Sequence, residues 1–376
     1  MKYYLIAGEA SGDLHGSNLI KELKKRDQKA VFRSWGGDLM EKAGSTVVKH
    51  YKDLSFMGFI EVVKNLPTIL TNLKFCKGDI TSFQPDVLIL IDYPGFNLRI
   101  AQWAKQQGYK IIYYISPQVW AWKEGRVKLI KKVVDKMLVI LPFEKEFYRK
   151  WNYDVAYIGH PLVQVINEYK NSGHALIPIL ENPTKPIIAL LPGSRKQEVS
   201  IKLPIMLQAA TAFPQYQFIV AKAPSLDEAF YSEILKDYPQ VGSVLNETYA
   251  LLSKSVGALV TSGTATLETA LFGVPEIVCY KGSAISYQIA RRLIKIKYIS
   301  LVNLIMDKLV VTELIQNDLT SENIIKELTF LLSDPLRKER VQKDYAALRE
   351  LLQQGGDASA KAADMILTFL QPTSSK

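Results

Sequence analysis

Short apolar runs alternate with helix-like patterns along the whole chain, and they fall into two sets. Strands separated by helical stretches form right-handed βαβ units, so this order predicts parallel sheets. We therefore predict an α/β protein in which two Rossmann-like domains face each other across a cleft. The predicted strands of the first sheet are Tyr3–Ala7, Val87–Ile91, Lys110–Ile115 and Met137–Leu141, and those of the second are Ile187–Leu191, Gln217–Ala221, Ala258–Thr261 and Glu276–Tyr280.

The boundary between the two sets lies in a stretch rich in Asn, Gly and Pro, residues 171–186, with prolines at 178, 183 and 186. Such a composition is typical of a linker. We expect a first domain over residues 1–170 and a second over residues 171–349. The tail is helical and is divided by Gly355 and Gly356, and its last helix, within residues 350–376, could pack back onto the first domain.

One segment, Leu54–Phe75, fits neither pattern, because large apolar residues occur on nearly every side of it. A helix that is apolar all round is either buried or inserted in an apolar medium. Two interpretations stay open: a buried core helix, or an acyl-chain groove or membrane-dipping element.

Composition narrows the class of protein. The two cysteines, Cys76 and Cys279, lie far apart and the four histidines do not cluster, so we expect neither a disulfide framework nor a metal site, and no cofactor. No apolar run reaches the ~20 residues of a membrane span and no signal peptide precedes the first strand, so a cytoplasmic protein is expected.

The net charge of +10, from 47 basic and 37 acidic residues, favours an anionic partner. No nucleic-acid-binding module is recognisable, so we expect no nucleic acid. Much of the excess lies in two mixed apolar–basic stretches, Lys123–Val134 and Ala290–Tyr298. Each is either a solvated helix face over a core stripe or a contact with an anionic bilayer surface.

The turn after the first strand, Gly8-Glu9-Ala10-Ser11-Gly12-Asp13, lies where open α/β sheets place their ligand crevice. It lacks the Gly-x-Gly-x-x-Gly spacing of a dinucleotide loop, and Glu9 would repel a diphosphate. We interpret it as a reaction-centre turn, with a helix expected from about Leu14. The alternative is a tight turn in which Ser11 or Asp13 caps the following helix.

Two further strand ends should open onto the same crevice. One carries Asp92 and Asn97, and Asp92 is a candidate general base, although it could equally cap the next helix. The other carries Gln118 and Trp120, the latter either a core residue or a platform for a sugar ring. His160 follows the strand-like run Val155–Ile158 near the domain crossover, either as a structural residue or as a residue of the cleft.

The second domain offers phosphate-type sites at two strand ends. Ser194 and Arg195 follow the strand Ile187–Leu191, and arginine provides forked donors for phosphate oxygens. Gly263 and Thr264 open a helix whose free N–H groups would face an anion, and Glu268 one turn later could accept from ribose hydroxyls. A basic surface turn and a Ser/Thr-capped helix are the alternatives. Together the two turns suggest a nucleotide–sugar site.

Six motifs in order along nearly the whole chain resemble the lipid-A-disaccharide synthase family. They are Ala7–Asp13, Ser116–Trp122, Leu141–Glu144, Gly159–Pro161, Leu191–Arg195 and Ser262–Glu268. The resemblance implies a GT-B glycosyltransferase that inverts the anomeric centre. It would transfer 2,3-diacylglucosamine from UDP to the 6-hydroxyl of 2,3-diacylglucosamine 1-phosphate, at the cytoplasmic face of the inner membrane.

The resemblance also implies roles for residues. Glu9 and Asp92 match the family's catalytic acids, Arg195 its nucleotide-side arginine, Glu268 a ribose-binding carboxylate and Asn303 a cleft asparagine. Many members carry Pro-Asp-Phe-Asn where this chain has Pro94-Gly95-Phe96-Asn97, so no role of that second carboxylate transfers. The expected substrate-binding residues are Ser11, Asn97, Gln118, Trp120, His160, Ser194, Arg195, Gly263, Thr264, Glu268 and Asn303.

The implied partners are UDP-diacylglucosamine, diacylglucosamine 1-phosphate and the anionic inner-membrane surface, and a homodimer is possible. Which of Glu9 and Asp92 is the base stays open, because both pKa values depend on burial and neighbours. Two other functions also stay open at this point. One is a UDP-sugar 2-epimerase-like enzyme of the same layout, and the other is a non-catalytic peripheral membrane or nucleic-acid binder.

Overall fold

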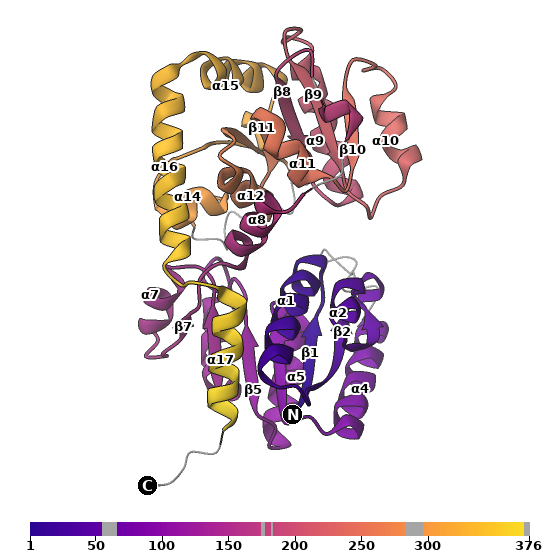
Figure 1. Ribbon diagram of the computed structural model, residues 1–376, viewed down its shortest axis with the longest axis vertical. Coiled ribbons are helices and arrows are strands. Elements are labelled where there is room, and N and C mark those ends of the chain that lie inside the picture. The colour runs from indigo at the N-terminus through magenta and orange to yellow at the C-terminus, as the bar shows by residue number, and fades with distance from the viewer. Residues whose placement is uncertain (55–65, 174–176, 182, 283–286, 288–295, 372–376) are drawn as a thin grey trace. The chain divides into compact units, whose positions relative to one another are not determined.

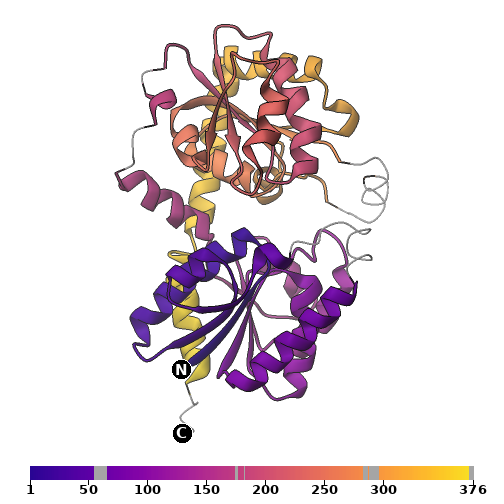
Figure 2. The same ribbon diagram turned by 90° about the vertical axis from the view of Figure 1, so that its right-hand side faces the viewer.

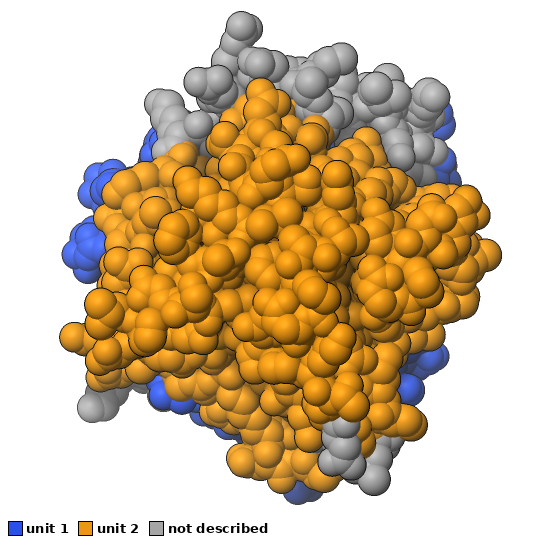
Figure 3. Space-filling model, turned by 90° about the horizontal axis from the view of Figure 1, so that it is seen from above, with its two compact units in different colours: residues 1–161, 352–376 blue, residues 162–351 orange. Residues whose placement is uncertain are grey.

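The computed structural model describes residues 1–54, 66–173, 177–181, 183–282, 287 and 296–371. The chain divides into two compact units, coloured separately in Figure 3. The first unit comprises Met1–Pro161 together with Leu352–Lys376, and the second comprises Leu162–Leu351. The chain therefore leaves the first unit at the start of one helix, α8 (Pro161–Asn171), and returns to it at the end of another, α16 (Pro335–Gln353).

The first unit is built on a seven-stranded sheet in which every observed pairing is parallel, in the order β3-β2-β1-β4-β5-β6-β7. Its strands are β1 (Lys2–Ala7), β2 (Val31–Gly36), β3 (Thr46–His50), β4 (Val87–Ile91), β5 (Ile111–Tyr114), β6 (Lys136–Val139) and β7 (Ala156–Tyr157). Its helices are α1 (Ala10–Arg26), α2 (Asp38–Lys42), η1 (Tyr51–Leu54), α4 (Leu66–Phe83), α5 (Pro94–Gln106), η2 (Glu124–Arg126), α6 (Val127–Val133), α7 (Glu144–Arg149) and α17 (Ala358–Leu370).

The second unit has a six-stranded parallel sheet in the order β10-β9-β8-β11-β12-β13. Its strands are β8 (Ile187–Leu191), β9 (Gln217–Lys222), β10 (Gly242–Leu245), β11 (Ser255–Thr261), β12 (Glu276–Tyr280) and β13 (Thr312–Ile315). Its other helices are η3 (Pro178–Leu180), α9 (Lys196–Ala210), α10 (Glu228–Leu235), α11 (Thr248–Lys254), α12 (Thr264–Phe272), α14 (Leu301–Met306), η4 (Gln316–Asp318) and α15 (Ser321–Ser333). The predicted α/β class with two parallel sheets is thus confirmed.

The apolar runs account for the central strands. Every residue of β4 and of β8 is buried, which is why these strands read as unbroken apolar runs. Alternate residues of β1 point to opposite faces, and Tyr4 and Ile6 join a core with residues of α4, α5 and α6. On the other face, α17 packs against α1, as Figures 1 and 2 show.

Four strands, β2, β3, β10 and β13, are absent from the sequence-based prediction. In β2 the pattern is broken by Arg33 and Ser34, and the structure shows why the sheet tolerates them. Arg33 makes a bidentate ion pair with Asp79 of α4, with its nearest N–O distance 2.6 Å, and the Ser34 hydroxyl bonds that of Ser45 at 2.8 Å. Polar side chains in a strand are acceptable where each finds a partner.

Two regions interpreted from the sequence lie largely outside the described residues. They are residues 55–65 of the Leu54–Phe75 segment and residues 290–295 of the second basic stretch. The described end of the first segment is helix α4, on which Leu70 and Phe75 are 58% and 48% exposed. Of the helices that the structure describes, none has the length and apolar character needed to cross a membrane.

Where the chain returns to the first unit, its backbone at Gly355 contacts the backbone at Gly159. A Cβ on Gly355 would lie 2.0 Å from the backbone nitrogen of Gly159, so the two backbones touch directly. The His160 backbone N–H also donates to the Leu352 carbonyl at 3.4 Å. Gly159 itself has a φ of +90°, a region that glycine adopts without strain.

Substituting Gly355 with alanine should therefore destabilise the protein. We expect Gly355→Ala to lower the free energy of unfolding by about 1–3 kcal/mol, because the added methyl group forces the two backbones apart. Gly78→Ala is the matched control, since Gly78 lies inside helix α4 with nothing within 4 Å of its Cβ position. That change should stabilise by about 0.5–1 kcal/mol. Urea unfolding of both variants tests this, and an unchanged midpoint for Gly355→Ala would contradict the crossing described.

Candidate active site

The first group of candidate residues lies where the strand order of the first sheet reverses. Strand β1 pairs with β2 on one side and β4 on the other, and Ala7 stands opposite Ile91. The residues that follow these two strands, Gly8-Glu9 and Asp92, are therefore neighbours at the carboxyl edge of the sheet. In a doubly wound sheet this reversal is the point where ligands bind.

Asp92 is held in an unusual environment. Its φ is +41° and that of Tyr93 is +47°, a left-handed conformation that is uncommon for residues other than glycine. Burial, followed by the nearby charge of Glu9, raises the pKa of the Asp92 carboxyl from its ordinary 3.8 to about 7. The turn packs tightly, since a Cβ on Gly8 would lie 2.4 Å from the Tyr93 ring. Asp92 can therefore gain or lose a proton near neutral pH.

The strained turn is fixed from below by two buried side chains. The Asn97 amide nitrogen donates to the carbonyls of Asp92 at 2.8 Å and Ile91 at 3.2 Å, and the Tyr113 hydroxyl donates to the Asp92 carbonyl at 2.6 Å. Asn97 has no exposed surface. The structure thus gives Asn97 a positioning role beneath Asp92.

The turn after β1 differs from its sequence-based interpretation in two respects. Helix α1 begins at Ala10 instead of near Leu14, with Glu9 as the N-cap residue, and the Glu9 side chain makes no capping hydrogen bond. Asp13 does not cap its own helix. Its carboxylate accepts three backbone N–H bonds, from Gly37, Leu39 and Met40, and so caps α2. Ser11 is exposed on the first turn of α1.

A second polar group follows strand β5. The Trp120 indole is half-buried and donates to Glu144 at 3.3 Å, and the same carboxylate accepts the Leu141 N–H at 2.9 Å. Burial raises the pKa of Glu144 to about 7. This carboxylate fixes Trp120 in place, and Gln118 beside it is exposed. The role of Glu144 was not predicted, although it lies inside a motif that carries the family resemblance.

His160 is buried in the first unit, with 4% of its surface exposed. Burial, with a smaller contribution from His15, lowers its pKa to about 3, so its ring is neutral at physiological pH. His15 is buried as well, and its pKa is lowered to about 4. Of the two interpretations left open by the sequence, the structural one fits this burial.

The phosphate-type turns of the second unit lie at the equivalent reversal of its sheet. Strands β8 and β11 are paired, and they lead into Gly193–Arg195 and Ser262–Thr264. Both turns need glycine, because φ is +118° at Gly193 and +137° at Gly263. Ser194, Arg195, Gly263 and Thr264 are all exposed, and α12 begins at Thr264 as predicted.

A buried lysine behind these turns was not predicted. Lys202 of α9 is 2% exposed, and its amine donates to the hydroxyl of Thr261 at the end of β11. Glu198 links it to the first turn, with N–O distances of 3.2 Å to Arg195 and 3.8 Å to Lys202. The helical spacing of Arg195, Glu198 and Lys202 could have revealed the two ion pairs from the sequence, but not the hydrogen bond to Thr261. This arrangement concentrates positive charge behind both phosphate-type turns.

Glu268 and Asn303, the remaining predicted residues, have different environments. Glu268 is half-buried, accepts a 2.8 Å hydrogen bond from the Tyr249 hydroxyl, and has a pKa raised by burial. The Asn303 side chain has no exposed surface and is fully engaged within the protein. Its oxygen accepts from the N–H groups of Val310 and Val311, and its nitrogen donates to Glu313 at 2.9 Å. Asn303 therefore supports its loop from inside.

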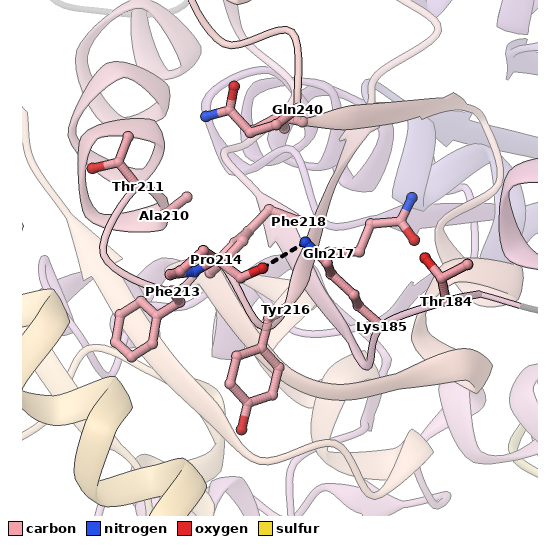
Figure 4. Close-up of a pocket in the computed structure, with 11 residues that line it drawn as sticks. Thr184, Lys185, Ala210, Thr211, Phe213, Pro214, Tyr216, Gln217, Phe218 and Gln240 are labelled. Carbon is pink, nitrogen blue, oxygen red and sulfur yellow. Dashed lines mark hydrogen bonds between the residues drawn. The ribbon is translucent and has the colours of Figure 1, made fainter.

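A pocket elsewhere in the second unit is not part of this arrangement. It is lined by residues that precede β8, β9 and β10, at the amino ends of the strands, and by the end of α9. Figure 4 shows it, with the Lys185 amine donating to the Pro214 carbonyl at 2.6 Å. The candidate residues follow the carboxyl ends of the strands. Among the residues that the structure describes, no three His, Cys, Asp or Glu side chains gather as metal ligands would.

Comparison with known proteins agrees with the motif pattern. A family model described as lipid-A-disaccharide synthetase matches residues 3–367. A lipid-A-disaccharide synthase from Syntrophus aciditrophicus is 41% identical over 373 residues, which cover 98% of this chain and 97% of that protein. The chain belongs to the lipid-A-disaccharide synthase family. It is therefore a glycosyltransferase that forms the lipid A disaccharide, and the epimerase and non-catalytic alternatives are not favoured.

Solved structures of low sequence identity share the fold of this synthase. A glycotransferase of kitacinnamycin has a TM-score of 0.67 at 14% identity, covering 98% of this chain and 99% of the other. A UDP-GlcNAc 2-epimerase from Neisseria meningitidis has a TM-score of 0.64 at 15% identity, covering 98% and 100%. These likenesses confirm the predicted GT-B class with its two Rossmann-like domains.

The positioning role of Asn97 can be tested by a substitution that replaces its amide nitrogen by an oxygen. Asn97→Asp replaces a donor that faces three carbonyls, those of Ile6, Ile91 and Asp92, by an acceptor. We therefore expect a loss of at least about 2 kcal/mol of unfolding free energy at pH 7.5. A protonated carboxyl can donate again, so the difference from the parent protein should shrink at pH 5. Asn18→Asp, on α1, should change stability by less than about 0.5 kcal/mol. Equal effects of the two substitutions would remove the proposed support.

Proposed function

We propose that this synthase transfers 2,3-diacylglucosamine from UDP to the 6-hydroxyl of 2,3-diacylglucosamine 1-phosphate, with inversion at the anomeric carbon. The products are the tetraacyl disaccharide 1-phosphate and UDP. The observation that carries the proposal is the division of chemistry between two sheet reversals. Two interacting carboxylates lie at one reversal, and glycine turns with arginine and lysine lie at the other. In this scheme the first half-site binds the acceptor and the second binds the donor.

On the acceptor side, Asp92 is the base, and the negative charge of Glu9 helps to raise its pKa. A base works best when its pKa lies near the working pH, and the pKa of Asp92 is raised to about 7. The acceptor hydroxyl attacks the anomeric carbon as its proton passes to Asp92, and the bond from that carbon to the UDP oxygen breaks. Ser11, Gln118 and Trp120 lie on exposed or half-buried parts of the same edge, and they bind the acceptor sugar in this scheme.

On the donor side, charge develops on the departing diphosphate. Arg195 and the N–H groups at Gly263 and Thr264 meet this charge, and Ser194 donates to a phosphate oxygen. Arg195 pairs with Glu198. Lys202, buried on the other side of Glu198, keeps that carboxylate neutralised when Arg195 turns to the diphosphate. Glu268 accepts from ribose hydroxyls.

We further propose that the enzyme works at an anionic membrane surface, where both acylated substrates reside. The net charge of +10 favours such a surface. Leu70 and Phe75 are exposed apolar side chains on α4, suited to contact with lipid. Lys128 and Lys132 are exposed on α6 above a buried face formed by Val127, Ile130 and Val133, so this stretch presents its charge to solvent. A homodimer remains a prediction.

Removing the base or the diphosphate arginine should abolish most activity. We expect Asp92→Asn and Arg195→Ala each to lower turnover at least ~100-fold. Arg149→Ala is the control, because Arg149 forms an exposed i,i+3 ion pair with Glu146, like the one between Arg195 and Glu198. UDP release and mass analysis of the product give the rates. Near-normal turnover in folded Asp92→Asn would exclude Asp92 as the base.

The pH dependence of kcat/KM distinguishes the role of Glu9 from that of Asp92. Because the unprotonated form of Asp92 is the active one, kcat/KM should rise with pH and level off above about 7. The negative charge of Glu9 raises the pKa of Asp92, so Glu9→Gln should move this limb to lower pH. Burial is the larger cause, so the limb should stay above the ordinary pKa of 3.8. A limb that stays in place in Glu9→Gln would contradict the assigned roles.

A further inference from the structure

An exposed tryptophan with two cations follows strand β5 in the first unit. Trp122 is 42% exposed, the Lys123 amine lies 4.2 Å from the centroid of its ring, and the Arg126 guanidinium carbon lies 5.7 Å from it. Lys123 has a φ of +56°, a left-handed conformation. We call Trp122, Lys123 and Arg126 the cation–tryptophan cluster. Cations beside an indole ring are attracted to its face, which holds them in place.

The positive charge of this cluster has no carboxylate partner within the described part of the chain. Neither Lys123 nor Arg126 forms an ion pair there, and nor does Arg99, which donates to the Gly95 carbonyl. The adjacent acid, Glu124, instead accepts the Trp151 indole N–H at 2.9 Å. Partial burial lowers the pKa of Lys123 and of Arg126, and the repulsion of Lys123 by Arg126 and of Arg126 by Arg99 adds to this effect. A bound anion would offset both the partial burial of the two cations and the repulsion among the positive charges.

The cluster follows the strand that is hydrogen-bonded to the turn of the proposed base. The Tyr113 hydroxyl, on β5, donates to the Asp92 carbonyl at 2.6 Å, and the Asp92 backbone N–H donates to the carbonyl of Ile115, directly after β5, at 3.2 Å. Arg99 lies on α5, the helix that begins directly after the Asp92–Tyr93 turn and packs against α6. The cluster follows the carboxyl end of β5 and Asp92 follows that of β4, and these strands are paired. Both therefore lie at the same edge of the first sheet.

We propose that the cation–tryptophan cluster binds the phosphate monoester of the acceptor. This inference rests on the proposed function, because it takes 2,3-diacylglucosamine 1-phosphate as the acceptor. A monoester carries a charge of about −1.5 to −2, which Lys123 and Arg126 can balance. The guanidinium offers paired donors to phosphate oxygens, and the exposed part of the Trp122 ring packs against the sugar. The cluster would thereby fix the acceptor sugar while its 6-hydroxyl faces Asp92.

A phosphate-bearing lipid of the bilayer has the same headgroup chemistry, so the experiment must separate the two sources. Two acceptors are compared in detergent micelles: 2,3-diacylglucosamine 1-phosphate and 2,3-diacylglucosamine without the phosphate. In the parent enzyme, kcat/KM should favour the phosphorylated acceptor by about 10–100-fold, the range for hydrogen bonds to charged groups. In the Lys123→Gln/Arg126→Gln double variant this preference should fall to about threefold or less. The rate with the unphosphorylated acceptor should stay the same.

A double variant with the same loss of charge serves as the control. Lys128→Gln/Lys132→Gln removes two exposed cations from α6, outside the cluster, and it should keep the full preference. Binding to phosphatidylglycerol vesicles without substrate is measured for both double variants. If the Lys123→Gln/Arg126→Gln variant binds vesicles more weakly but keeps its acceptor preference in micelles, the cluster is a headgroup site and the proposal is overturned.

The proposed function and the phosphate subsite can be overturned separately. A parent enzyme that makes no disaccharide from either acceptor would overturn the proposed function. A parent enzyme that makes the disaccharide, with a cluster variant that retains the full phosphate preference, would overturn only the phosphate subsite. The Trp122→Leu variant tests the contact between the ring and the sugar. If the ring packs against the sugar, this variant should raise KM for both acceptors alike.

Discussion

The chemistry of this protein depends on the parallel pairing of a first strand with the fourth in the same sheet. Because β1 is hydrogen-bonded to β2 on one side and β4 on the other, the chain leaves β1 and β4 toward opposite faces. The two carboxyl ends remain adjacent and open. Glu9 and Asp92, far apart in the sequence, thereby come close enough for the charge of one to raise the pKa of the other. Strands β8 and β11 are paired in the same way in the second sheet, and the turns that follow them carry glycines and cationic side chains.

The backbone that carries the candidate residues is held by buried polar side chains that a ligand need not contact. Asn97 and Tyr113 hold the Asp92 carbonyl, Glu144 holds the Trp120 indole, and Asn303 ties α14 to the residues before β13. Such side chains are costly to bury unless they are satisfied, and here they satisfy the irregular backbone that carries the candidate residues. The backbone that carries the candidate residues can therefore adopt a strained conformation and still be held in place.

The sequence predicted those parts of the fold whose signal is local. Strands such as β4 and β8 are apolar throughout and were found with the same bounds, whereas β2 carries Arg33, whose partner Asp79 lies far along the chain. The turns that carry Asp92, Arg195 and Gly263 were found because they directly follow such strands. The buried partners were not, because nothing in the local pattern shows that Asp13 caps α2 or that Lys202 reaches Thr261. Similarly, burial distinguishes Asn97 and Asn303 from exposed candidates, and burial is a property of the folded chain.

The contact between Gly159 and Gly355 has a consequence for the order in which the protein is made. The second unit is continuous in sequence, so all of its strands have left the ribosome before the first unit is complete. The first unit must wait for α17, which covers α1 and follows the whole second unit in the sequence. Until α17 has been synthesised, the apolar surface of α1 that α17 will cover stays unprotected. The candidate base thus belongs to the unit that depends on this later segment, so a chain that stops before α17 would contain a complete second unit and an incomplete first unit.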